Sequence, residues 1–407
     1  MLDVKKVRMD FPILTTRQHG HPLVYLDNAA TMQMPTPVLD RISSHYHAEN
    51  GNVHRGVHSL SQKSTDALER SREITADFIG ASPDEVIFTS GTTDSFNLLS
   101  RMLESSIRSG QQIIVSSMEH HSNLIPWQEL CRRTGAFLSI IPMDKGCNLD
   151  LDSLRRLLRS DTALVAITLT SNVTGTVNPV SEIAMMAHSA GALAVVDAAQ
   201  GMRLGKTDVA ALGCDFMAFS GHKLGALTGI GVLYGKSDFL RRISPVRFGG
   251  GMVREVSYRS ATYGNPPHRF EAGTPNYVGA ISLAAAINYM KRLGLSDIAA
   301  HEQALTDSLV SLLSAMPEVT VIGSPSRRCG VVSFVVPGVH PFDLGVMLDS
   351  LGIAVRTGHM CAQPLVNALG YDSVIRVSPA FYNTEEELES FAAALKKLVP
   401  LLKGDAT

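Results

Sequence analysis

Short runs of β-branched and aromatic residues alternate with amphipathic helical stretches through the middle of this chain. The runs predicted as strands are residues 86–89, 113–115, 164–167, 193–196, 216–219 and 230–233. Helices are predicted between them at residues 66–78, ended by Gly80, and at residues 182–190. This alternation indicates an α/β fold with a mostly parallel sheet that is covered on both faces. Ligands of such sheets bind where strands end, so the residues after each strand are candidate site residues.

The pattern changes after Tyr277, where a long helical segment at residues 280–293 begins. Further strands are predicted at residues 331–336 and 353–356, and a last helix at residues 385–398. The sequence therefore predicts two domains. A large domain spans residues 20–290, and residues 1–19 and 291–407 form a smaller α+β domain.

The composition excludes several classes of protein. Apolar residues make up 45% of the 407 residues and the net charge is −2, so neither nucleic acid nor an anionic membrane is an expected partner. Residues 1–10 mix acids and bases without a long apolar run, so no secretory signal is expected there. The most apolar stretch, residues 278–290, is too short to span a bilayer.

The five cysteines are scattered along the chain, odd in number and without CxxC spacing. This pattern argues against a disulfide framework and against a structural zinc site. It favours a reducing compartment, and we expect a cytoplasmic protein.

Four strand ends carry residues typical of a cofactor site. After the first strand come Ser90, Gly91, Thr92 and Thr93, and a helix predicted to begin at Asp94. Small residues with hydroxyl and N–H groups at a helix N-terminus suit a phosphate, although an ordinary capping turn explains this segment equally well on its own. Asp197 and Gln200 follow the strand at 193–196 and could hold a heterocyclic N–H and an adjacent oxygen. The alternative for Asp197 is a helix cap.

Lys223 follows the strand at 216–219, next to Ser220 and His222. An amine directly after a buried strand can be desolvated, which lowers its pKa as Schiff-base chemistry requires. The alternative is a surface loop lysine. His120 and His121 follow the strand at 113–115, and one of the two rings could stack on a flat ligand. A phosphate turn, an aspartate, a lysine and a stacking group together predict a pyridoxal-phosphate (PLP) site.

At this point the sequence resembles the fold-type I PLP enzymes of the class V aminotransferase group, which implies a seven-stranded type of sheet in the large domain. The resemblance is carried by residues 25–31, 52–56, 119–121, 171–176, 197–200, 220–223 and 269–276. The most specific segment is Arg356, Thr357, Gly358, His359, Met360, Cys361, Ala362, Gln363 and Pro364. It resembles the short cysteine loop of group II cysteine desulfurases, the kind that serves SUF-type iron–sulfur assembly. The resemblance covers residues 10–398.

The resemblance implies a role for each matching residue. Lys223 would hold PLP covalently, Cys361 would be the nucleophile, and His120 would stack on the ring and relay protons. The other implied cofactor-binding residues are Thr92, Thr93, Asp197, Gln200, Ser220, His222 and, from the second subunit of a homodimer, Thr274. The implied substrate-binding residues are Asn172, Arg356 and Arg376, with Arg356 favouring the thiolate. No metal site is implied.

Cys361 could instead be a small buried hydrophobe, which is the usual state of a lone cysteine. Its surroundings favour a reactive thiol, because Arg356, Gly358, His359 and Pro364 describe a mobile, electropositive loop. Met360 departs from the family pattern, where a histidine usually precedes the cysteine. Cys131, Cys147, Cys214 and Cys329 are expected to be structural.

The implied reaction converts L-cysteine to L-alanine and leaves a persulfide on Cys361, from which a SUF-type acceptor protein takes the sulfur. One alternative is a selenocysteine lyase, which would need the thiol less. Another is a PLP aminotransferase or epimerase of the same fold, which would need no thiol. A non-catalytic sulfur carrier is the alternative from a different class, and the presence of Lys223 and Asp197 speaks against it.

Overall fold

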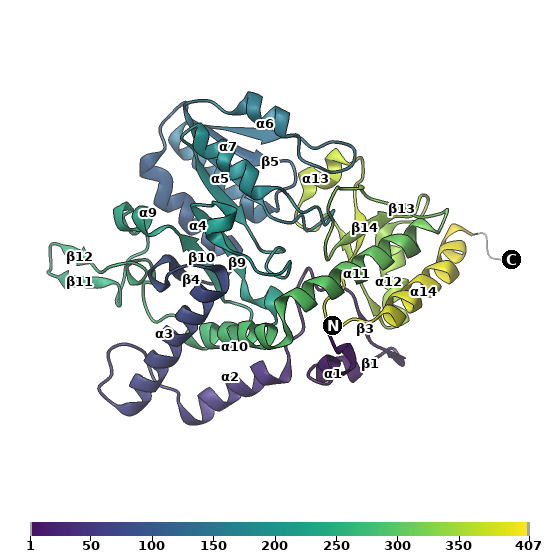
Figure 1. Cartoon of the computed structure of the whole chain (residues 1–407), viewed down its shortest axis with the longest axis horizontal. Coiled ribbons are helices and arrows are strands. Elements are labelled where there is room, and N and C mark those ends of the chain that lie inside the picture. Colours follow the sequence, from purple (N-terminus) through teal and green to yellow (C-terminus); the bar gives the residue numbers. More distant parts are fainter. Residues whose placement is uncertain (1, 405–407) are drawn as a thin grey trace.

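A computed structural model describes residues 2–404, and its centre is a seven-stranded sheet in the order β4-β10-β9-β8-β7-β5-β6 (Figure 1). The strands are β4 (Val86–Thr89), β5 (Gln112–Ser116), β6 (Phe137–Ile141), β7 (Thr162–Thr168), β8 (Leu193–Asp197), β9 (Phe216–Ser220) and β10 (Gly231–Gly235). Only β10 pairs antiparallel with its neighbours in this sheet. The predicted mostly parallel α/β sheet is therefore confirmed.

The six strands predicted for this sheet are all present, within two residues at each end. The seventh, β6, was not predicted. It lies at the edge of the sheet beside β5, and its burial alternates irregularly, so its sequence carries neither a continuous apolar run nor a clear period of two.

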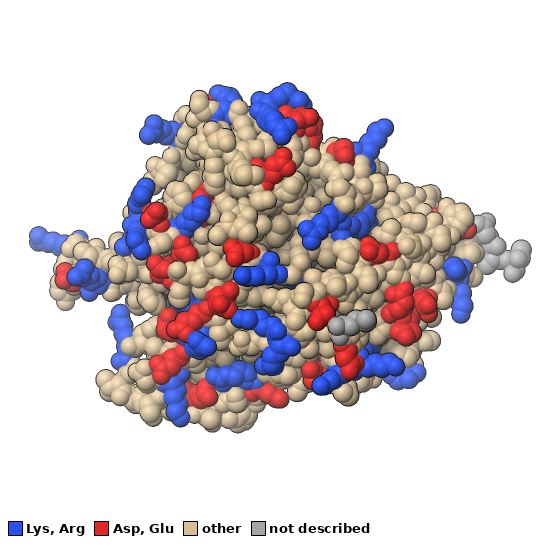
Figure 2. Space-filling view, viewed as in Figure 1, with Lys and Arg blue, Asp and Glu red and all other residues tan. Residues whose placement is uncertain are grey.

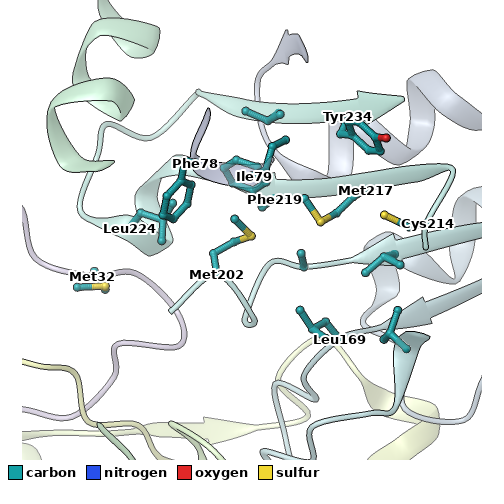
Figure 3. Close-up of a cluster of buried hydrophobic side chains, with 14 of the residues drawn as sticks. Met32, Phe78, Ile79, Leu169, Met202, Cys214, Met217, Phe219, Leu224 and Tyr234 are labelled. Atoms are coloured by element: carbon teal, nitrogen blue, oxygen red, sulfur yellow. The ribbon is translucent and has the colours of Figure 1, made fainter. Parts of the chain in front are cut away.

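Helices cover both faces of the sheet. Alternate residues of each buried strand therefore pack in different apolar clusters, one on each face. Phe216 of β9 packs in one cluster, and Met217 and Phe219 pack in the other. Figure 3 shows the second cluster, where Met217 and Phe219 lie near Phe78 and Ile79. The helices of this part are α2 (Thr36–Ala48), α3 (Ser59–Ile79), α4 (Thr92–Leu103), α5 (Ile125–Thr134), α6 (Leu151–Leu157), α7 (Val180–Ser189), α8 (Val209–Leu212), α9 (Ser237–Arg242) and α10 (Tyr277–Leu293).

The four helices α3, α4, α7 and α10 all begin before their predicted starts, α7 at Val180 and α10 at Tyr277. Helix α3 begins at Ser59, where the His58 side chain accepts the Ser61 N–H, and not at residue 66. Its predicted end is correct, because Gly80 takes the left-handed φ of +70° that closes the helix. Helix α4 begins at Thr92 and not at Asp94, so the predicted phosphate turn is itself the first helical turn.

The C-terminal third forms a second, four-stranded antiparallel sheet in the order β13-β14-β17-β16. Its strands are β13 (Thr320–Val321), β14 (Val332–Val335), β16 (Arg356–Gly358) and β17 (Val374–Val377). Its apolar cluster draws on the helices α11 (Leu295–Ser314), α12 (Pro341–Ser350) and α14 (Glu385–Lys403). The predicted α+β character is thus present.

The strand predicted at residues 353–356 is split in two. Residues Ile353–Ala354 form β15, which pairs in parallel with β3 (Val24–Tyr25), and β16 follows it. β3 lies in the part predicted as the large domain, yet it pairs with a strand of the C-terminal region. The chain therefore contacts the C-terminal region near residue 24. The domain limits at residues 19/20 and 290/291 stay a prediction.

The remaining elements lie outside the two main sheets. They are α1 (Val4–Arg8), α13 (Gln363–Ala368), the paired strands β1 (Arg17–Gln18) and β2 (His21–Pro22), and the hairpin β11 (Val253–Val256) with β12 (Ala261–Tyr263), which projects from the body in Figure 1. Basic and acidic side chains are interspersed on the face shown in Figure 2. Across residues 2–404, no helix is both long enough and apolar enough to cross a membrane.

Candidate active site

A cavity of about 260 Å³ opens where β8 and β9 end. It is lined by Ala29, Ala30, Thr92, Thr93, His120, Ser122, Thr168, Thr170, Asn172, Asp197, Ala199, Gln200, Ser220, His222, Lys223, Arg356, Met360, Cys361 and Arg376. Every site residue predicted from the sequence lies in this lining except Thr274, which is exposed elsewhere on the chain. The structure thus brings together residues from both sheets.

Lys223 lies in the 3₁₀ turn η5 (Gly221–Leu224), which directly follows β9. Its amine makes no hydrogen bond within residues 2–404. Burial lowers the pKa of Lys223 to about 8, while the negative charge of Asp197 acts to raise it and Arg376 acts to lower it. Near neutral pH a much larger fraction of this amine is therefore neutral and nucleophilic than in an ordinary lysine, although the protonated form still predominates.

Asp197 is the last residue of β8, and its side chain is buried. One carboxylate oxygen accepts the Ala199 N–H at 2.9 Å. Burial raises the pKa of Asp197, and Lys223 is the one nearby cation that acts against this shift. Gln200 is anchored through its amide, which donates to the Ala29 carbonyl at 2.7 Å.

His120 lies in front of the 3₁₀ turn η4 (His121–Asn123), and its Nδ1 accepts the Ser122 N–H at 3.1 Å. Burial lowers the pKa of His120 to about 3, so the ring is neutral at ordinary pH. Because Nδ1 is the acceptor, the proton of the neutral ring lies on Nε2. The adjacent His121 ring turns elsewhere and accepts the Gln363 N–H at 3.1 Å through Nε2.

Hydroxyl groups cluster at the N-terminus of α4. The Thr92 N–H donates to Ser220 Oγ at 2.8 Å, and the Thr93 and Ser122 hydroxyls are 2.6 Å apart. Beside them, burial and the Lys223 charge lower the pKa of His222 to about 4. Neutral donors at a helix N-terminus form a site suited to a phosphate.

One aspartate organises the two arginines of the cavity. Asp27 receives Arg376 Nη2 on Oδ1 at 3.0 Å and Arg356 Nη2 on Oδ2 at 2.7 Å. Arg376 also donates to the Asn172 carbonyl at 3.1 Å, and its buried Nε has no hydrogen-bond partner within the described chain. No role was predicted for Asp27, although it lies in one of the segments that carry the resemblance.

Cys361 is exposed, whereas the other four cysteines are buried. Its φ is +53° and that of Met360 is +54°, so two consecutive non-glycine residues adopt the left-handed conformation. The Asn172 amide donates to the Met360 carbonyl at 2.6 Å. The Cys361 carbonyl accepts the His121 N–H at 2.7 Å. These two contacts hold the cysteine at the edge of the cavity.

Glu119 is a further residue that sequence reasoning left without a role. It is fully buried behind His120, and it accepts hydrogen bonds from Ser116 Oγ (2.5 Å), the Thr168 N–H (2.9 Å) and the Asn123 amide (2.6 Å). Burial raises the pKa of Glu119 to about 8, and the three donors act in the opposite direction. Glu119 thereby connects the His120 segment to the end of β7.

The family model described as aminotransferase class-V matches residues 24–391. A cysteine desulfurase of Synechococcus elongatus is 44% identical over 398 residues, which are 97% of this chain and 64% of that protein. A probable cysteine desulfurase of Halalkalibacterium halodurans is 44% identical over 97% of this chain and 98% of its own length. The apo structure of a cysteine desulfurase from Thermococcus onnurineus has a TM-score of 0.94, with 40% identity and 99% of each chain covered. The chain thus spans less than two thirds of the Synechococcus protein and nearly all of the other two.

Proposed function

The chain belongs to the class-V aminotransferase family, among the relatives of the cysteine desulfurases, and on this premise we propose that it converts L-cysteine to L-alanine with PLP as cofactor. The sulfur is received by Cys361 as a persulfide. One observation carries the proposal: a lysine amine without a hydrogen-bond partner in the described chain and an exposed cysteine thiol line the same cavity.

The residues of the cavity fit PLP by their chemistry. Lys223 offers the amine that an aldehyde requires, and Asp197 offers a buried carboxylate for a pyridinium N–H. The proposed phosphate ligands are the groups of Thr92, Thr93, Ser220 and His222, joined by Thr274 of a second subunit. The face of the ring would stack on His120, and Gln200 would meet its phenolic oxygen.

When bound, PLP supplies an electron sink for negative charge at the substrate α-carbon. Arg376, with Asn172, would bind the substrate carboxylate. Lys223 or His120 would take the α-proton, and Lys223 is the better base because the pKa of His120 is lowered to about 3. Arg356, which also lines the cavity, is paired with Asp27 at 2.7 Å.

The thiolate of Cys361 would then attack the sulfur of the substrate. A sulfur–sulfur bond forms as the carbon–sulfur bond breaks, and the carbon takes up a proton to become the methyl group of alanine. One cysteine and one thiol thus give one alanine and one persulfide, without an external oxidant or reductant. A sulfur-acceptor protein of the SUF type would receive the persulfide sulfur in a reducing, cytoplasmic setting.

A selenocysteine lyase is the second candidate for the same cavity, since selenium leaves more easily than sulfur. The exposed thiol of Cys361 favours the desulfurase, because a lyase, an aminotransferase or an epimerase would not require it at this place.

The direct test is to incubate the PLP-loaded protein with L-cysteine, without reductant, and to locate added sulfur by peptide mass spectrometry. We expect one additional sulfur atom on the peptide of Cys361, with alanine formed in equal amount. Cys131 and Cys329 serve as internal controls, because both are buried. Alanine formation with the Cys361 peptide unmodified would overturn the proposal.

A further inference from the structure

Two histidines and one glutamate converge at a place outside the cavity of Lys223. His54 lies in the loop before α3, Glu69 lies on α3, and His268 begins the 3₁₀ turn η6 (His268–Phe270). One side-chain donor atom of each lies within 4.8 Å of the others, and His54 Nε2 is 3.9 Å from Glu69 Oε1. Three segments thus present a set of nitrogen and oxygen donors to one point.

The two oxygens of Glu69 have different surroundings. Oε2 accepts a hydrogen bond from Arg72 Nε at 3.1 Å, which fixes the direction of the carboxylate. Oε1, the oxygen nearest His54, is buried and has no hydrogen-bond partner within the described chain. A carboxylate held by one oxygen, with the other turned toward two imidazoles, is the arrangement typical of a metal-ligating carboxylate.

The charge balance also favours a cation. Arg72 is buried and pairs with Glu69 and, at 2.7 Å, with Glu271. Two carboxylates, Glu69 and Glu271, face one guanidinium, so their charge is only partly compensated beside the two imidazole rings. The two rings, 5.4 Å apart between centroids and 75° between planes, present their nitrogens without stacking face to face.

We propose that His54, Glu69 and His268 bind a late first-row divalent metal ion of the Zn²⁺ class. Imidazole and carboxylate ligands suit this class at bond lengths of about 2.0–2.2 Å. Tetrahedral coordination at these bond lengths places donor atoms about 3.4 Å apart. The donor atoms now lie within 4.8 Å of one another, so each pair must approach by about 1.5 Å at most. Partly exposed side chains close such gaps by rotation. The lack of CxxC spacing argued only against a cysteine-bound zinc ion, and the present site contains no cysteine.

A metal at this place would tie the loop of His54 and the turn η6 to α3. Residues 271–276, which include Thr274, follow η6 directly. The ion would therefore order the segment that the proposed dimer presents to its partner, without touching the reacting groups.

The test uses protein freed of metal with EDTA, in a Cys361→Ala background so that no exposed thiol competes. Co²⁺ binding is followed by visible absorption, and Zn²⁺ binding by calorimetry and by the rise in melting temperature. We expect one ion per chain. His268→Ala and Glu69→Gln should each weaken binding roughly tenfold or more and remove the thermal stabilisation.

The matched control is His19→Ala. His19 also pairs with a carboxylate, Asp349 at 2.9 Å, but no second histidine joins that pair. Its loss should leave metal binding unchanged. Circular dichroism checks that each variant is folded. The His268 side chain makes no hydrogen bond to residues 2–404, so its removal leaves the test valid if Glu69→Gln does not fold. Failure of the parent to bind either ion at millimolar concentration, or equal binding by His268→Ala, would overturn the proposal.

Discussion

The main-chain N–H of His121 donates to the carbonyl of Cys361 at 2.7 Å, so the thiol-bearing loop is attached to the residue next to His120. The His121 ring adds a second contact by accepting the Gln363 N–H. The cysteine loop is thus positioned by the segment that lines the opposite part of the cavity, across 240 residues of sequence.

We predict that His121→Ala loosens the cysteine loop, because the Gln363 N–H loses its acceptor at a cost of about 1 kcal/mol. Hydrogen–deuterium exchange of the peptide containing Cys361 should become faster, and the desulfuration rate should fall while the cofactor absorbance stays. His359→Ala is the control, since the exposed His359 ring makes no hydrogen bond within residues 2–404. Unchanged exchange in His121→Ala would show that the ring does not restrain the loop.

The lowered pKa of Lys223 predicts the pH dependence of cofactor uptake. Only the neutral amine reacts with an aldehyde, so the rate at which cofactor-free protein takes up PLP should rise with pH through about 8 and level off above it. Asp197 raises the pKa of Lys223, so Asp197→Asn should move the midpoint to lower pH. Lys291→Ala, at the surface of α10, should keep the parental midpoint. A midpoint near the ordinary lysine value of about 10.4 would contradict the assignment.

The central strands could be predicted from the sequence because each is a short, continuous run of Val, Ile, Leu and Phe that is buried on both faces. Once the strands are known, the residues that follow them can be predicted as site residues, because the carboxyl ends of parallel strands lie at one edge of the sheet. Asp197 and Lys223 were found in this way, and both line the cavity.

The role of Asp27 could not be predicted, because its partners Arg356 and Arg376 lie more than 320 residues away in the sequence. Nothing local to Asp27 marks it as a bridge between two arginines. The starts of α3 and α4 were also placed too late, since polar first turns carry no apolar period. The cap at His58 is visible only once the loop is folded.

Glu119 should be a stabilising residue as well as a link between segments. Glu119→Gln places an NH₂ group against a donor, either the Asn123 amide or the Thr168 N–H, and should lower the free energy of unfolding by about 1–3 kcal/mol. Urea unfolding above pH 8, where the Glu119 carboxylate is ionised and can only accept hydrogen bonds, measures the change. Glu129→Gln, on the exposed face of α5, should have a much smaller effect. Equal free energies of unfolding for Glu119→Gln and Glu129→Gln would contradict this prediction.

The family resemblance places Thr274, which is exposed on this chain, at the phosphate of a second subunit, and so predicts an assembly in which two chains complete each site. We expect sedimentation to give twice the mass of the chain. Thr274→Val should weaken PLP binding without dissociating the dimer, because the hydroxyl would be lost from the phosphate site and not from the interface. A monomer that binds PLP and is fully active would contradict both expectations.

The central claim is that Lys223 and Cys361 perform separate parts of one reaction in one cavity, and Cys361→Ala tests it most directly. Alanine, sulfide and selenide are measured for the parent and the variant with L-cysteine and with L-selenocysteine. Because the cofactor site around Lys223 remains complete, the variant should keep its cofactor absorbance, lose nearly all activity with L-cysteine, and retain substantial activity with L-selenocysteine. Desulfuration of L-cysteine by Cys361→Ala at the parental rate would contradict the account.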